Sequence, residues 1–138
     1  MHRILIIDDE DDIREVAALS LETVAGWEVM VASSGAQGLA RAATYQPDAI
    51  LLDSGAGSGQ AFEWRGVRSF LTETELPFIV AGGLSPENAG MAIRIFRPYG
   101  VDVVSGVESA PGKKDREKLK AFVTAVRNAE KEEWAAQH

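Results

Sequence analysis

The stretch RILIIDDEDDIREVAALSLE (residues 3–22) contains a pattern that the rest of the chain repeats. Its apolar run, Ile4 to Ile7, is continuous rather than alternating, which is typical of a parallel strand covered on both faces. The residues after the run place apolar side chains at spacings of three and four, which indicates an amphipathic helix. The stretch therefore predicts one strand followed by one helix.

Four more strand–helix units follow along the chain. Strands are predicted at Val29–Ala32, Ala49–Leu52, Phe78–Ala81 and Val101–Val104, and helices at about residues 13–24, 36–43, 62–71, 86–96 and 115–129. Ser85 caps the fourth helix, Pro98 ends it, and the tail KEEWAAQH (residues 131–138) is expected to fray. Five such units imply right-handed crossovers. We therefore predict an α/β fold, a flavodoxin-like doubly wound five-stranded parallel sheet of order 2-1-3-4-5 with about five helices.

The composition excludes several classes of function. The 138 residues carry a formal net charge of −7 and include no cysteine. This length allows one hydrophobic core, so a single domain is expected over residues 1–138. An acidic surface repels phosphate backbones and anionic lipid, so we expect no binding to nucleic acid or membrane. Without cysteine, disulfides, thiolate zinc sites and a cysteine base are excluded. Neither a signal peptide nor about 18 consecutive apolar residues occur, which predicts a cytoplasmic protein.

Acidic residues end the first and third predicted strands. Asp8, Asp9 and Glu10 follow the first strand, and Asp53 follows the third. In the predicted strand order these strands are neighbours, so several carboxylates meet at one edge of the sheet. Oxygen ligands of this kind suit Mg²⁺, for which Asp8, Asp9 and Asp53 are the candidate ligands. The alternative is that the acids after the first strand only cap the helix that follows.

The first 53 residues resemble a response-regulator receiver domain, on the stretches RILIIDDEDDIREVAALSLE and VMVASSGAQGLARAATYQPDAILLD. The resemblance implies metal ligation by Asp8 and Asp9 and phosphoryl acceptance by Asp53. Receivers carry a Ser or Thr after the fourth strand and a Lys after the fifth, where this chain has Gly82 and Ser105. A degenerate receiver of a phosphorelay is therefore the alternative function.

Two glycine-rich loops follow the fourth and fifth predicted strands. Gly82 and Gly83 form the first loop, and Ser105 and Gly106 form the second. Without side chains in the way, their backbone N–H groups can converge on one anion, as in barrel enzymes that bind phosphate between their last two strands. The alternative is that these glycines only form tight turns.

Residues 51–130 resemble the C-terminal part of phosphoribosylanthranilate isomerase, a TIM-barrel enzyme of tryptophan biosynthesis. The motifs are AGGLSPENA (residues 81–89), GVDVVSGVES (residues 100–109) and PGKKD (residues 111–115). The resemblance implies phosphate binding by Gly83, Ser105 and Gly106, with Gly82 permitting the approach. It also implies that Asp53 is a general acid, whose partner in the family is a cysteine base that this chain lacks.

We interpret the chain as an engineered chimera, with a receiver-derived half (residues 1–53) and a barrel-derived half (residues 54–138). It is expected to bind phosphate or a phosphorylated small molecule at Gly82, Gly83, Ser105 and Gly106. Isomerase turnover is expected to be absent, so the chain is predicted not to be an enzyme; turnover with a water or carboxylate base is the weakest alternative. No cofactor is required, Mg²⁺ is permitted, and no protein partner is expected, while the oligomeric state is left open.

Overall fold

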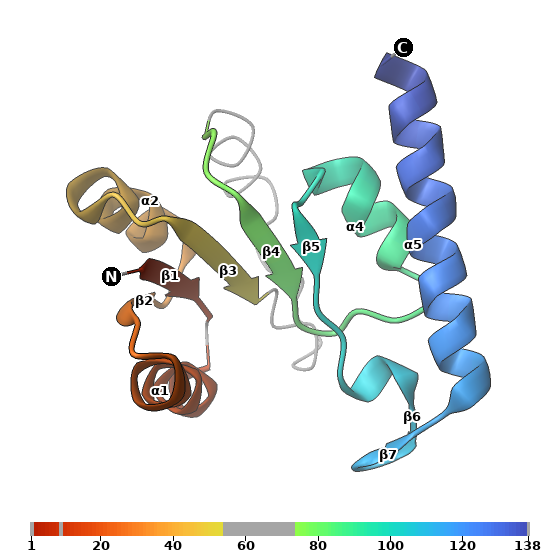
Figure 1. Cartoon of the computed structure of the whole chain (residues 1–138), viewed down its shortest axis with the longest axis horizontal. Helices are drawn as coiled ribbons and strands as arrows, with labels where there is room; N and C mark the ends of the chain where they lie inside the picture. The colour runs from red at the N-terminus through yellow and green to blue at the C-terminus, as the bar shows by residue number, and fades with distance from the viewer. Residues whose placement is uncertain (1, 9, 54–73, 138) are drawn as a thin grey trace.

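The computed structural model describes residues 2–8, 10–53 and 74–137. Its main sheet has five parallel strands in the order β2-β1-β3-β4-β5 (Figure 1). The strands are β1 (Arg3–Ile7), β2 (Glu28–Ala32), β3 (Ala49–Asp53), β4 (Phe78–Ala81) and β5 (Gly100–Val101). The predicted flavodoxin-like sheet and its strand order are therefore confirmed.

The described helices follow the predicted alternation with the strands. They are α1 (Asp11–Ser20), which continues as the π-helix η1 (Leu21–Ala25), α2 (Gly35–Tyr45), α4 (Ala89–Phe96) and α5 (Arg116–Gln137). Local chemistry sets their ends: the Ser34 side chain accepts a hydrogen bond from the Gln37 backbone N–H at the start of α2. Gly26 ends η1 in the left-handed conformation. The predicted helix at residues 62–71 lies outside the described residues.

The core lies on one face of the sheet. Side chains of alternate strand residues are buried there, namely Leu5, Ile7, Ile50, Leu52 and Val80. Ala42 of α2 and Ala92 and Phe96 of α4 pack on them. Full burial of a Leu or Ile side chain contributes about 1.5–3 kcal/mol, so this cluster is the main stabilising feature of the sheet.

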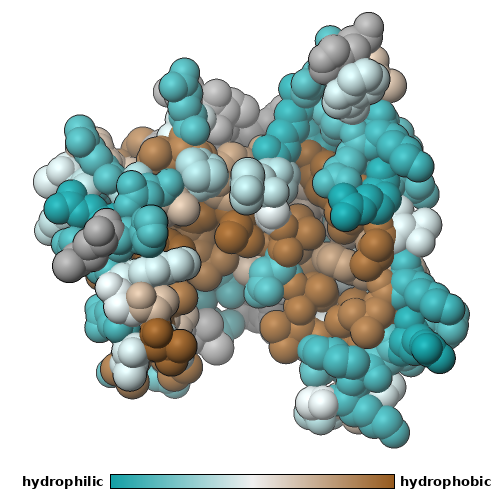
Figure 2. Space-filling model, viewed as in Figure 1, coloured by the Kyte–Doolittle hydropathy of each residue, from teal (hydrophilic) through white to brown (hydrophobic). Residues whose placement is uncertain are grey.

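The opposite face of the sheet is only partly covered by the described helices. Helix α1 and η1 lie over β1 and β2, whereas α5 packs against α4 (Figure 1). Leu51 of β3 and Ile79 of β4 are in register on this face and stay half-buried. Figure 2 shows apolar surface between α1 and α5 on this side of the molecule.

The fifth strand is shorter than predicted, because it ends at Val101 rather than Val104. The last ladder bond joins the Asp102 backbone N–H to the Val80 carbonyl oxygen at 2.9 Å. The chain after β4 turns away from the sheet at Gly82, whose φ is 84°. The residues after Asp102 therefore have no neighbouring strand to pair with. Beyond them lie the 3-10 turn η3 (Ser105–Val107) and a hairpin of β6 (Glu108–Ala110) and β7 (Lys113–Lys114).

Two helix boundaries also differ from the prediction. Helix α4 starts at Ala89 rather than Pro86, because residues 86–88 form a turn in which the Ala89 backbone N–H donates to the Ser85 carbonyl oxygen. Helix α5 extends to Gln137, so the expectation of a frayed tail is wrong. Ion pairs from Glu132 to Arg94 and from Glu133 to Arg97 hold its last turns on α4. Across the described residues, every helix is too short or too polar to cross a lipid bilayer.

Candidate functional site

The first candidate loop begins where β4 ends. Ala81 pairs with Asp53 in the parallel register, so Gly82 and Gly83 lie one and two residues beyond the end of the ladder. Both glycines are left-handed, with φ of 84° and 63°. That conformation costs a residue with a side chain about 1–2 kcal/mol, so the turn favours glycine at both positions.

The second candidate loop touches the first. Gly106 lies in η3, and a Cβ atom built on it would lie 1.8 Å from the Leu84 carbonyl oxygen and 3.1 Å from the Ser85 Cα atom. No side chain fits between them, so glycine is needed for this approach. The structure therefore brings the loop of Ser105 and Gly106 against Leu84 and Ser85, which directly follow Gly83. The shared anion site stays a prediction.

Asn88 fixes the shape of the first loop, a role that the sequence analysis missed. Its Oδ1 atom accepts a hydrogen bond from the Ser85 backbone N–H at 2.7 Å, and its Nδ2 atom donates to the Gly83 carbonyl oxygen at 2.9 Å. Both bonds are local, and an asparagine just before a helix is the available sequence signal. The Asn88 amide therefore holds the chain between Gly83 and Ser85 in a defined position.

Lys114 fixes the second loop from the hairpin. Its Nζ atom donates to the Val104 carbonyl oxygen at 3.0 Å and forms an ion pair with Glu108 at 3.1 Å. Val104 directly precedes Ser105, so the ammonium group lies beside the start of η3. The sequence contains a signal for this contact in the turn Pro111–Gly112, which reverses the chain toward Ser105.

Two carboxylates lie at the carboxyl ends of the neighbouring strands β1 and β3. Ile7 pairs with Leu52, so Asp8 and Asp53 follow at the ends of neighbouring strands, which run about 4.8 Å apart. Asp8 is 2% exposed, and its Oδ1 atom accepts from the Glu10 backbone N–H at 2.9 Å. Asp53 is half-buried. This arrangement places a pair of acids beside the glycine loops.

The predicted metal site is incomplete in the part of the chain that the structure describes. Asp9, its third expected ligand, lies outside that part. Within residues 2–8, 10–53 and 74–137, no group of three His, Cys, Asp or Glu side chains is placed to hold a metal ion. Among the predicted ligands, the described residues include Asp8 and Asp53, and Mg²⁺ sites commonly use one or two carboxylates together with water. The metal site therefore stays a prediction.

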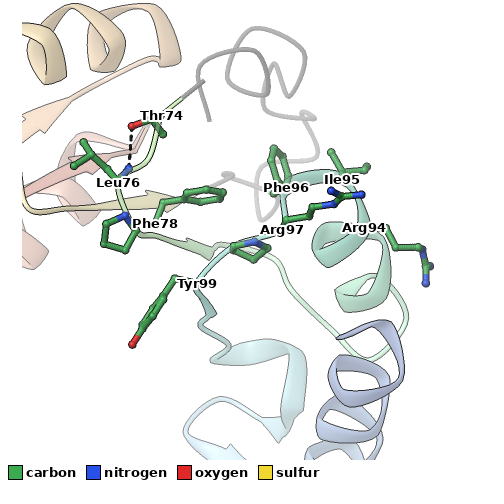
Figure 3. A pocket seen from close by; sticks show the side chains of 10 residues that line it. Thr74, Leu76, Phe78, Arg94, Ile95, Phe96, Arg97 and Tyr99 are labelled. Carbon is green, nitrogen blue, oxygen red and sulfur yellow. Dashed lines mark hydrogen bonds between the residues drawn. The ribbon is translucent and has the colours of Figure 1, made fainter. Parts of the chain in front are cut away.

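A pocket of about 670 Å³ lies near the amino ends of β4 and β5 (Figure 3). It is bordered by the end of α4 and by the residues before β4 and β5, and the Thr74 hydroxyl accepts there from the Leu76 backbone N–H at 3.2 Å. Phe78 begins β4, so this pocket lies at the amino ends of the strands. The glycine loops are at the carboxyl ends, and the pocket is therefore separate from the candidate site.

The sequence model of the family N-(5'-phosphoribosyl)anthranilate (PRA) isomerase matches residues 9–125. Among similar proteins, the N-(5'-phosphoribosyl)anthranilate isomerase of Magnetococcus marinus is 52% identical over 85 residues, 60% of this chain and 39% of that protein. The isomerase of Myxococcus xanthus is 46% identical over 103 residues, 69% of this chain and 48% of that protein. The chain thus spans less than half of the length of these relatives.

Solved structures of two kinds resemble the chain. Phosphoribosyl anthranilate isomerase from Thermococcus kodakaraensis has a TM-score of 0.57 and 37% identity, covering 92% of this chain and 64% of that one. The chemotaxis response regulator CheY4 of Vibrio cholerae has a TM-score of 0.62 and 20% identity, covering 94% of this chain and 98% of that one. The resemblance to both isomerases and receivers is therefore confirmed, and at 20% identity the receiver likeness concerns the fold alone.

These comparisons correct the predicted function. Relatives of about 50% identity are named as isomerases. The expectation of an engineered chimera without turnover is therefore wrong, and so is the prediction that the chain is not an enzyme. The alternative of a degenerate phosphorelay receiver is wrong for the same reason. The prediction of no turnover depended on the absent cysteine base, with a water or carboxylate base as the weakest alternative. A carboxylate also accepts protons, and Asp8 lies at the strand end beside Asp53.

Proposed function

Because this chain belongs to the N-(5'-phosphoribosyl)anthranilate isomerase family, we propose that it catalyses the isomerisation of N-(5'-phosphoribosyl)anthranilate. The observation that carries the proposal is the contact between Gly106 and the Leu84 carbonyl oxygen, which joins the two glycine loops. The substrate has a phosphate group that these loops suit. The activity stands as a proposal because the chain spans 39–48% of the length of the two relatives described above.

The substrate phosphate binds to backbone N–H groups of Gly83, Ser105 and Gly106, with Gly82 leaving room for it. These amides come from two touching loops, so they need no further ordering when the anion arrives. The Lys114 ammonium beside Ser105 adds a positive charge. Asp53 opposes binding, because at about 5–10 Å and an effective dielectric constant of about 20 its repulsion is about 2–3 kcal/mol per charge pair. The amide donors and the Lys114 ammonium must outweigh this repulsion.

The two acids supply the proton transfers. The isomerisation delivers a proton to the ring oxygen of the sugar and removes one from a carbon, so it needs both an acid and a base. Asp53 is the acid, in agreement with its position in the family motif. Asp8 is the base, because it is a buried carboxylate at the end of the strand next to Asp53. The proposal uses no metal ion and no other cofactor.

Turnover of N-(5'-phosphoribosyl)anthranilate by the purified chain tests this assignment. We expect Asp53→Asn and Asp8→Asn to lower kcat about 100-fold or more, the range for loss of one general acid or base. Asp48→Asn is the matched control, since Asp48 lies at the opposite edge of the sheet and accepts from the Arg3 backbone N–H at 2.7 Å. Turnover no higher than that of Asp53→Asn would refute the catalytic proposal.

Titration with inorganic phosphate tests the anion site separately. Ser105→Pro removes one of the proposed amide donors, and Lys114→Ala removes the charge beside it, so both variants are expected to bind phosphate at least tenfold more weakly. Lys113→Ala is the control, because its neighbour Lys114 makes the contact with Val104. Equal affinity in all of these proteins would show that the phosphate binds elsewhere, whatever the result of the turnover assay.

The finer organisation of the chain also belongs to the proposal. The receiver resemblance is assigned to residues 1–53 and the isomerase resemblance to residues 51–130, within one domain in the cytoplasm. Support comes from the identity to isomerases, which extends over 60–69% of the chain in the two relatives described above. The family model's match to residues 9–125 extends across this boundary. Comparing residues 1–53 alone with both families therefore tests the division, and a better isomerase than receiver match there would overturn it.

A further inference from the structure

Two helices of the chain expose apolar side chains to solvent. On α1, Val16 and Leu19 are 65% and 63% exposed, and on α5, Leu119 and Val123 are 39% and 53% exposed. Each pair is three or four residues apart and so lies on one face of its helix. An exposed apolar row on a helix indicates a surface that another element covers.

The charges beside these two rows are mainly of opposite sign, although α5 also carries the exposed acids Glu117 and Glu130 near its row. Exposed acids flank the row on α1 and its continuation η1, at Asp12, Glu15 and Glu22. Exposed cations flank the row on α5, at Arg116, Lys120, Arg127 and Lys131. Of these seven, only Arg127 takes part in an ion pair among the described residues, with Glu130 at 2.9 Å. The acidic and basic rows are therefore complementary surfaces.

The two rows cannot meet within one chain in this structure. Figure 1 shows α1 and α5 at opposite ends of the sheet, with β3, β4 and β5 between them. Ion pairs from Arg94 to Glu132 at 3.2 Å and from Arg97 to Glu133 at 2.9 Å hold α5 on α4. Among residues 2–8, 10–53 and 74–137, the two rows therefore do not cover each other, and a second molecule can supply the complementary partner of each.

The part of the sheet between the two helices completes the surface. Leu51 and Ile79 are half-buried there, although strands inside a parallel sheet are normally covered on both faces. Figure 2 shows this apolar area between the helices. A helix laid along it beside α1 would bury these side chains.

We propose that two copies of the chain form a symmetric dimer in which α5 of each copy lies along α1 of the other and along the part of its sheet that the described helices leave open. A twofold axis generates both contacts at once, because each copy presents one acidic and one basic row. A 22-residue helix is about 33 Å long and about 10 Å wide, so each α5 covers about 300 Å². As each copy both gives and receives a helix, about 600 Å² per partner is buried, which is at the lower limit for a specific interface.

Sedimentation equilibrium of the intact chain tests this proposal. A mass of twice 14.9 kDa is expected at micromolar concentration, with weaker association at high salt. A monomer across the micromolar range would overturn the proposal. The measurement is independent of phosphate binding and of isomerase turnover, so failure of the proposed function leaves its outcome unaffected.

Charge reversal then tests the pairing of the rows. Glu15→Lys with Glu22→Lys, or Lys120→Glu with Lys131→Glu, is expected to raise the dimer dissociation constant at least tenfold, and all four changes together should restore it. Glu75→Lys with Glu87→Lys is the control, since both residues are exposed and lie outside the rows. Circular dichroism checks that each variant is folded. Dimers unaffected by either double reversal would contradict the pairing.

Discussion

The substitution Gly106→Ala is the sharpest test of how the two glycine loops meet. The added Cβ atom would lie 1.8 Å from the Leu84 carbonyl oxygen, a distance that real Cβ contacts do not reach. The Leu84 oxygen belongs to the backbone, and the backbone of residue 106 fixes the position of the Cβ atom. Neither atom can rotate aside, so the loops must separate by more than about 1 Å. Overpacking of this kind costs about 3 kcal/mol at the upper end of its usual range.

Gly112→Ala is the matched control for Gly106→Ala. Gly112 also lies in a loop and has φ of 76°, but a Cβ atom there would meet nothing within 4 Å. Its substitution is therefore expected to cost only the left-handed penalty of about 1 kcal/mol. The two variants should differ by about 2 kcal/mol in the free energy of unfolding, or about 30-fold in the folding equilibrium.

Urea unfolding measures this difference. With a typical slope, the midpoint of Gly106→Ala is expected about 1 M urea below that of Gly112→Ala. Inorganic phosphate titration of the same proteins should show weaker binding for Gly106→Ala alone, because only that change separates the proposed amide donors. If both variants unfold at the same urea concentration, the loops do not touch, and the proposed phosphate site loses its geometric basis.

Three further substitutions test the supports of the fold and the site. Asn88→Ala removes the bonds to Ser85 and Gly83, so it should cost about 1–2 kcal/mol in urea unfolding and weaken phosphate binding, whereas equal affinity would contradict its positioning role. Ser34→Ala removes the side-chain cap of α2 and is expected to lower stability by about 1 kcal/mol with phosphate affinity unchanged. Leu5→Ala, in the fully buried cluster, should cost about 2–5 kcal/mol, and a loss below 1 kcal/mol would argue against the described core.

The order of the strands could be predicted because continuous apolar runs and short connections leave few topologies for a parallel sheet. The glycine loops could be placed for the same reason, since the carboxyl ends of parallel strands share one edge. The function was predicted wrongly because the missing cysteine base outweighed the alternative of a water or carboxylate base. Asp8 and Asp53 are 45 residues apart in sequence, and only their neighbouring strands make them a candidate acid–base pair.

Local patterns were sufficient for what depends on neighbours in sequence: the four full-length strands and the glycines that turn the chain. Contacts between distant segments set the rest. β5 stops at Val101 because Gly82 removes its partner, and α5 continues to Gln137 because α4 supplies Arg94 and Arg97. The ends of these elements depend on which residues of other segments lie beside them in the folded chain. The periodicity of a single segment does not show which residues those are.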